Sequence, residues 1–179
     1  MNKLKNRPEK KQIHPALLLI DVQNQYMEYM AEKNSKLTFD TINWAITLFR
    51  QCDYPVISIY HTDPKMGPSP DSDAFKFDPA FQVEPDDPKF IKNYPNAFKN
   101  TDLDKFLREK ECNTLFLCGL SAVGCVLATY YSAFDLEYNV FMLKNGIMSH
   151  DSSFTKFVED AMESVSIYTL NFMLTSRQF

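Results

Sequence analysis

The sequence predicts an α/β protein, a three-layer α/β/α sandwich in which helices cover both faces of a six-stranded, mostly parallel, Rossmann-like sheet. Two observations support this fold class. Short apolar runs alternate with longer segments of helical periodicity along nearly the whole chain. The apolar runs are continuous and do not alternate with polar residues, which is typical of parallel strands buried on both faces. We expect the strand order 3-2-1-4-5-6, the common order of doubly wound sheets.

The expected elements follow from these patterns in chain order. The apolar runs predicted to be strands are residues 16–20, 55–60, 89–92, 114–120, 139–144 and 165–170. The segments predicted to be helices are residues 37–52, 100–110, 124–136 and 152–164. Thr101 is expected to cap the second of these helices. Residues 62–88 are rich in Pro, Asp and Phe without periodicity, so we expect an ordered loop or lid there.

Length and charge limit the class of protein. The chain has 179 residues and a net charge of −4, which favours one domain over residues 14–179 and argues against a nucleic-acid-binding surface. Residues 1–13 are strongly basic and are predicted to form a flexible arm. No segment resembles an export signal, and no apolar run is long enough to span a bilayer. We therefore expect a cytoplasmic protein without membrane contact.

The residues that directly follow the strands are the first candidates for a functional site. Ligands of open parallel sheets bind at the carboxyl ends of the strands. Position alone selects Asp21, His61, Lys92, the segment from Gly119 to Cys125, and Asn145. The selection nevertheless includes an acid, a base and a thiol, a combination that suits nucleophilic catalysis.

Cys125 lies where a helix is expected to begin after the fourth strand. Backbone N–H groups and the positive helix end would lower the pKa of its thiol and could hold an oxyanion. Taken alone, a small buried side chain packed on the sheet is the commoner role of such a cysteine. Asp21 beside the thiol could take up its proton and return it, and Lys92 could keep Asp21 ionised and stabilise developing negative charge.

Other kinds of site receive less support. A metal site on His61 and Asp63 lacks neighbouring His ligands, and the four cysteines show no spacing typical of a zinc site or a disulfide framework. The motifs GxSxG, GxGxxG and the P-loop are absent. A redox pair of Cys118 and Cys125 is disfavoured because Cys118 is expected inside a strand.

Three motifs in order resemble the isochorismatase-like cysteine hydrolases, a family that includes nicotinamidases, carbamoyl-amide hydrolases and isochorismatase. The first is ALLLIDVQNQYM, which resembles the family's opening strand with its DxQ motif. The second, KNYPNAF, resembles the lysine segment, and the third, CGLSAVGCVLATYYSAFDLEYNV, resembles the nucleophile segment. The resemblance extends over roughly residues 16–165 and implies the isochorismatase-like hydrolase fold.

The resemblance also implies catalytic roles. Asp21 matches the general acid/base, Lys92 the charge-stabilising lysine, and Cys125 the nucleophile. A cis peptide bond is implied between Leu120 and Ser121. Such a bond would direct the N–H groups of Ser121 and Cys125 at one oxyanion position.

The sequence departs from the family pattern at several positions. Ala122 stands where the family usually has Thr, so a hydroxyl hydrogen bond is lost, and Asn96 stands where Ser is commoner. The nicotinamidase metal cluster of one Asp and three His is missing, so we expect no metal and no other cofactor, and a metal-oriented nicotinamide is disfavoured as substrate. The presence of Cys125 favours covalent acyl chemistry over vinyl-ether hydrolysis.

The sequence therefore predicts a hydrolase that cleaves a C–N bond of a small amide, carbamoyl compound or ureide through a thioester on Cys125. The alternatives are a binding or assembly module with little activity and a vinyl-ether hydrolase of the isochorismate type. The residues expected to bind or enclose the substrate are Gln23, Tyr26, His61, Phe98 and Tyr130, with Phe75, Phe77 and Phe81 of the lid. The family resemblance implies a homodimer or homotetramer, with residues 130–138 and 171–179 as candidate contacts.

Overall fold

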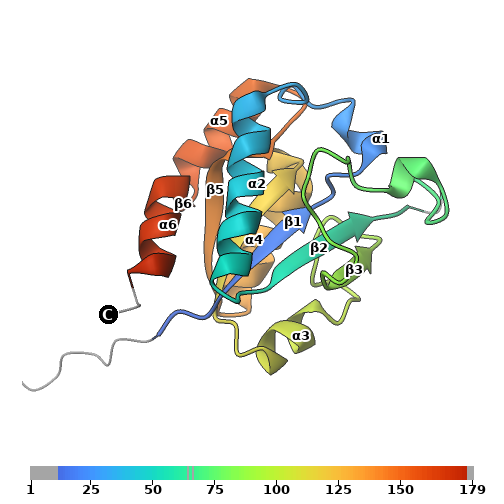
Figure 1. Cartoon of the computed structure of the whole chain (residues 1–179). Helices are drawn as coiled ribbons and strands as arrows, with labels where there is room; N and C mark the ends of the chain where they lie inside the picture. The colour runs from blue at the N-terminus through green and yellow to red at the C-terminus, as the bar shows by residue number, and fades with distance from the viewer. Residues whose placement is uncertain (1–11, 64, 66, 177–179) are drawn as a thin grey trace, which may run out of the picture.

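The structure of the protein is a computed structural model that describes residues 12–176 except 64 and 66 (Figure 1). The predicted basic arm over residues 1–13 therefore falls almost entirely outside the described residues, as do the last three residues of the candidate contact 171–179. In the described part of the chain, no helix combines the length and the apolar character needed to cross a bilayer.

One sheet of six strands forms the centre of the molecule, and its order, β3-β2-β1-β4-β5-β6, confirms the predicted order. All five neighbouring pairs are parallel. The strands are β1 (Pro15–Ile20), β2 (Val56–His61), β3 (Lys89–Lys92), β4 (Thr114–Leu120), β5 (Asn139–Met148) and β6 (Ser164–Val165). Every residue of the central strands β1 and β4 is buried, which explains their uninterrupted apolar sequence.

Helices cover both faces of this sheet, as the predicted three-layer sandwich requires. The helices are α1 (Asn24–Met27), α2 (Lys36–Gln51), α3 (Leu103–Glu109), α4 (Leu127–Asp135), α5 (Ser152–Ala161) and α6 (Ile167–Thr175). Helices α2 and α6 pack on one face, with α2 crossing the front of the sheet in Figure 1. Helices α3 and α4 contribute to the apolar layer on the opposite face, together with Val158 of α5.

The last predicted strand, residues 165–170, is wrong beyond its first residue. Strand β6 ends at Val165, and α6 begins at Ile167. The hydroxyl of Ser166 accepts a hydrogen bond from the backbone N–H of Thr169 at 3.1 Å, which caps the helix. The buried residues of α6 are Ile167, Leu170 and Leu174. This is helical spacing, which the alternating β-branched residues Val165, Ile167 and Thr169 concealed.

Two further predictions need correction at element boundaries. The helix expected from residue 100 begins at Leu103, with Asp102 at the N-cap position. The hydroxyl of Thr101, one residue before the N-cap, accepts a long hydrogen bond from the backbone N–H of Leu103 at 3.4 Å and donates to the carbonyl oxygen of Ala97 at 2.6 Å. The helix expected from Gly124 begins at Leu127, because a π-helical turn over Ala122–Val126 comes before it.

Gly119 allows β4 to lie unusually close to the end of β1. Its φ angle is +106°, and a Cβ atom added to it would lie 2.1 Å from the carbonyl oxygen of Ile20. Only glycine accepts both the left-handed backbone and this close approach. Because Ile20 directly precedes Asp21, Gly119 sets the distance between the chain at Asp21 and the chain that continues to Cys125.

We expect Gly119→Ala to lower the free energy of unfolding by about 2 kcal/mol or more, because the added methyl group overlaps backbone and the left-handed angle is strained. Urea unfolding followed by circular dichroism measures the change. A variant as stable as the wild type would show that β4 and β1 are not held at this distance.

Candidate active site

Asp21 follows β1 and is held in an uncommon conformation. Its φ angle is 55°, a left-handed value that is rare outside glycine, and its backbone N–H donates to the carbonyl oxygen of Ile59 at 2.9 Å. Only 2% of Asp21 is exposed. Its Oδ2 atom accepts a hydrogen bond from Lys92 Nζ at 2.7 Å. Its Oδ1 atom is buried and has no hydrogen-bond partner among the described residues, so one carboxylate oxygen remains available.

Lys92 at the end of β3 connects Asp21 to His61. The side chain of Lys92 is 0% exposed, and its Nζ atom lies 2.7 Å from Asp21 Oδ2 and 3.2 Å from His61 Nδ1. An ammonium group has no lone pair, so Lys92 is the donor in both contacts. The Nδ1 atom of His61 is therefore an acceptor, and the neutral ring carries its hydrogen on Nε2. Burial and the charge of Lys92 both lower the pKa of His61, which keeps the ring neutral.

Gln23 holds the end of β2 in place. The amide nitrogen of Gln23 donates to the carbonyl oxygen of His61 at 3.0 Å, and the backbone N–H of His61 donates to the amide oxygen of Gln23 at 2.7 Å. Gln23 is 0% exposed. Its expected contact with substrate is thus replaced by a structural role, because both ends of its amide are bound to backbone.

Cys125 lies in the π-helical turn, which brings its side chain close to Asp21 and His61. The carbonyl oxygen of Ser121 accepts hydrogen bonds from the backbone N–H groups of Gly124 at 2.9 Å and Val126 at 3.1 Å. These bonds hold the turn without the hydroxyl that the family's usual Thr would supply at Ala122. The peptide bond between Leu120 and Ser121 is cis, at the position that the family resemblance implied.

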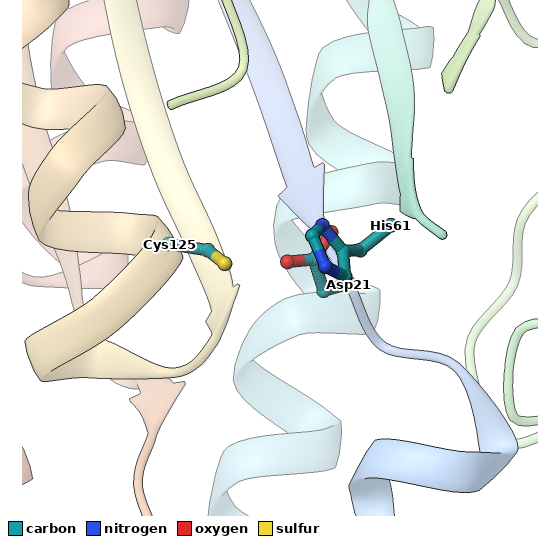
Figure 2. A group of neighbouring side chains, drawn as sticks. All are labelled: Asp21, His61 and Cys125. Atoms are coloured by element: carbon teal, nitrogen blue, oxygen red, sulfur yellow. The ribbon is translucent and has the colours of Figure 1, made fainter. Parts of the chain in front are cut away.

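The thiol and the carboxylate face each other across the site. Figure 2 shows the sulfur of Cys125 directed toward the carboxylate of Asp21, with His61 beside Asp21. The sulfur, a carboxylate oxygen of Asp21 and a ring nitrogen of His61 all lie within 4.8 Å of one another. The structure therefore brings together the four residues that sequence position selected at the ends of β1, β2 and β3 and after β4. The fifth, Asn145, lies within β5, where its backbone N–H donates to Glu159.

The pKa of Cys125 shifts in the direction opposite to the sequence-based expectation. Burial, followed by the nearby negative charge of Asp21, raises the pKa of the Cys125 thiol to about 12. Burial also raises the pKa of Asp21, although Lys92 opposes that rise. At rest the thiol is therefore protonated, and the carboxylate of Asp21 is the nearby acceptor for its proton. The expected lowering by the helix end is outweighed because the sulfur is largely buried beside a carboxylate.

The cluster of Asp21, His61 and Cys125 does not fit a metal ion. The ammonium group of Lys92 already contacts both Asp21 and His61. A metal ion there would stand beside a buried positive charge, and His61 Nδ1 is occupied by the lysine. Asp63, the other ligand considered from the sequence, is not a member of this cluster.

A pocket of about 260 Å³ opens onto these side chains. It is lined by Asp21, Tyr26, Tyr29, Met30, His61, Leu120, Ser121 and Cys125. Tyr26 and His61, which the sequence predicts to bind substrate, both line this pocket. Burial, followed by the negative charge of Asp21, raises the pKa of Tyr26 to about 12, so its hydroxyl stays protonated. Tyr29 and Met30 were missed, although they follow closely after the DxQ motif.

The remaining aromatic residues expected at the substrate site lie elsewhere. Phe98 stacks on Tyr138 at a ring distance of 5.9 Å, within the layer formed by α3 and α4. The Tyr130 hydroxyl accepts a weak hydrogen bond from the backbone of Glu163. Neither residue lines the pocket.

The three phenylalanines of the lid do not line the pocket either. Phe75 and Phe77 stack on Tyr60 at 5.0 and 4.0 Å, and Phe81 stacks on Phe39 at 5.0 Å. All three are buried. They therefore attach the segment 62–88 to the body of the protein, and their role is packing.

Ser149 is a further residue that sequence reasoning missed. It is 0% exposed, and its hydroxyl lies 3.2 Å from the hydroxyl of Ser121. Its backbone N–H donates to the carboxylate of Glu32 at 3.1 Å. Ser149 follows β5 directly, at the same edge of the sheet as the catalytic candidates, and strand β5 had been predicted to end four residues too early.

Comparison with known proteins identifies the family of this chain. A model of the isochorismatase domain matches residues 15–172. The chain belongs to the isochorismatase family. Members of this family are hydrolases, so the chain is an enzyme of the hydrolase class.

Two relatives from Bacillus subtilis are both called uncharacterized isochorismatase family proteins. YddQ is 29% identical over 128 residues, which cover 69% of this chain and 71% of YddQ. YrdC is 23% identical over 162 residues, which cover 87% of each chain.

Solved structures of similar fold include two hydrolases. An isochorismatase-like hydrolase from Alkaliphilus metalliredigens gives a TM-score of 0.78 at 20% identity, over 88% of this chain and 96% of that one. A cysteine hydrolase from Pseudomonas syringae pv. phaseolicola gives 0.77 at 19% identity, over 91% and 93%. At such identity these likenesses establish the fold.

We expect Asp21→Asn to lower the pKa of the Cys125 thiol by about one to three pH units, because it removes the negative charge that opposes ionisation of the sulfur. The pH dependence of alkylation by iodoacetamide, followed by mass spectrometry of the Cys125 peptide, measures this pKa. Thermal unfolding of the same sample confirms that it is folded, and Asp63→Asn is the matched control. A pKa that rises in Asp21→Asn would contradict the assignment.

Proposed function

We propose that this hydrolase cleaves a C–N bond of a small amide, carbamoyl compound or ureide through a thioester on Cys125. The observation that carries the proposal is the unpaired Asp21 Oδ1 atom in a pocket that it shares with the Cys125 thiol. A buried acceptor without a partner is costly and is rare unless it has a function. A proton acceptor beside a protonated nucleophile is the arrangement that acyl transfer requires.

In the first step, the sulfur of Cys125 attacks the substrate carbonyl carbon while its proton passes to Asp21 Oδ1. The C–S bond forms, and the electron pair of the carbonyl moves onto its oxygen. The backbone N–H groups of Ser121 and Cys125 are the proposed donors to this oxyanion. Lys92 stays bound to Asp21 Oδ2 and stabilises the negative charge that builds up in the site.

In the second step, the tetrahedral intermediate collapses and the C–N bond breaks. The proton on Asp21 passes to the departing nitrogen, which leaves as ammonia or an amine. A water molecule then gives a proton to Asp21 and attacks the thioester. When the C–S bond breaks, Asp21 returns the proton to the sulfur, so the acid product leaves and Cys125 is regenerated as a thiol.

Two other functions remain in view without a specific observation in their favour. A binding or assembly module would not need an unpaired carboxylate oxygen in the pocket of a thiol. A vinyl-ether hydrolase would not need the thiol itself. The trapping experiment described below distinguishes both from an amide hydrolase.

The homodimer or homotetramer and the cytoplasmic location stay predictions. Exposed aromatic side chains support the first of these. Tyr131 and Phe134 on α4 are 51% and 67% exposed, and Phe172 on α6 is 70% exposed. These residues belong to the two segments that the sequence marks as candidate contacts.

We expect Cys125→Ala to reduce amide hydrolysis by about a thousandfold or more while the protein stays folded, because the acyl enzyme can no longer form. In wild-type protein, hydroxylamine added during turnover should intercept the thioester and yield a hydroxamic acid, measured as its iron complex. Cys52→Ala is the control and should keep full activity. Hydrolysis without any hydroxamate, or with full activity in Cys125→Ala, would contradict the thioester.

We expect kcat/KM to fall at acid pH as Asp21 becomes protonated, because a protonated carboxyl cannot accept the thiol proton. Since burial raises the pKa of Asp21, this loss should occur above the ordinary Asp value of 3.8. Burial and the charge of Lys92 lower the pKa of His61, so protonation of this ring should occur only below its ordinary value of 6.5. A pH profile of ammonia release tests the direction, and an acidic limb below the ordinary value would contradict the burial argument.

A further inference from the structure

The one ion pair beside the pocket is neutral overall, and among the described residues no unpaired positive side chain lines the pocket. Asp21 is paired with Lys92, whose side chain is 0% exposed and does not line the pocket. His61 is neutral because its Nδ1 atom accepts from Lys92. None of the described pocket-lining residues is a lysine or an arginine. A substrate carboxylate would therefore meet no partner, and the unpaired Asp21 Oδ1 would repel it.

The rest of the wall is apolar or neutral. Tyr26, Tyr29, Met30 and Leu120 supply most of the lining. The volume of about 260 Å³ lies just below the range of about 300 to 1,000 Å³ typical of ligand pockets. Burying a charged group against such walls without a partner is strongly unfavourable. The pocket therefore suits a small molecule whose non-reacting part carries no charge.

We propose that the substrate is a small uncharged carboxamide with an apolar acyl group, and that the pocket rejects compounds carrying a carboxylate. This proposal rests on the proposed function for the reaction and adds the class of substrate. The pocket offers a neutral amide both a hydrogen-bond acceptor and uncharged hydrogen-bond donors. The unpaired Asp21 oxygen is an acceptor, while the Nε2–H of His61 and the hydroxyl of Tyr26 are uncharged donors. An ammonium group would instead bind Asp21 Oδ1 and remove the base from the reaction.

The first test compares two alkylating reagents that differ in charge. Iodoacetamide is neutral and iodoacetate is anionic, and both require the same thiolate, so the pKa of Cys125 cancels from the ratio of their rates. Mass spectrometry measures the ratio at Cys125 in the folded protein and in protein unfolded in urea. Cys52, which is partly exposed and distant from the pocket lining, is the internal reference.

We expect the preference of Cys125 for iodoacetamide over iodoacetate to be about tenfold or more greater in the folded than in the unfolded protein, because a like charge in a desolvated site is strongly disfavoured. The preference at Cys52 should not change. An equal ratio in both states, or a folded preference for iodoacetate, would overturn the proposal.

The second test compares substrates of matched shape by ammonia release. Succinamate and 4-methylpentanamide have the same chain, with a carboxylate in one and an isopropyl group in the other. We expect kcat/KM for 4-methylpentanamide to exceed that for succinamate by about tenfold or more. Tyr29→Arg adds a positive charge at the exposed mouth of the pocket and should reduce this ratio, whereas Tyr29→Gln should not. Equal or faster turnover of succinamate by the wild type would overturn the proposal.

The two tests separate this proposal from the proposed reaction. If no amide is hydrolysed but the alkylation ratio rises on folding, the reaction is wrong and the charge selectivity stands. If succinamate is hydrolysed as well as its neutral counterpart, with hydroxamate formed in hydroxylamine, the reaction stands and the charge selectivity is wrong. Failure of both measurements would overturn both.

Discussion

The buried ion pair between Asp21 and Lys92 is the interaction on which the rest of the site depends. Removing two charges from water is costly, and each charge stays buried because it has the other. The two residues end strands β1 and β3, with β2 between them, so the lysine must reach across the end of β2. On that path it meets His61 and sets its tautomer. The pair also uses just one oxygen of Asp21, which leaves the other to face the thiol.

Three structural features hold the other groups of the site in place around this ion pair. Gly119 allows β4 to approach the end of β1, so the turn that carries Cys125 begins close to Asp21. The amide of Gln23 binds the backbone of His61 on both sides and fixes the end of β2. The backbone N–H groups that converge on the Ser121 carbonyl oxygen hold the turn itself. All three features involve main-chain atoms, and two of them still require a particular residue, glycine at position 119 and glutamine at position 23.

The sequence was sufficient to predict the order of the strands in the sheet and the residues that gather at the strand ends. Buried parallel strands have a distinctive apolar pattern, and their carboxyl ends meet at one edge of the sheet. It was insufficient where the outcome depends on distant contacts. Phe98 and Tyr130 are aromatic residues near the right motifs, yet the direction of their side chains is decided by packing partners such as Tyr138. The thiol pKa of Cys125 depends on burial and on a carboxylate about a hundred residues away in the chain, neither of which a local motif reveals.

The pairing of Asp21 with Lys92 has a consequence for how charge moves during the proposed cycle. With the thiol protonated, the buried region holds one negative and one positive charge. When the proton passes to Asp21, the negative charge moves to the oxyanion, and after the nitrogen leaves it returns to the carboxylate. The total stays at zero in each of these states. A desolvated site can therefore remain closed to ions from solvent throughout the reaction, since no state requires a counter-ion.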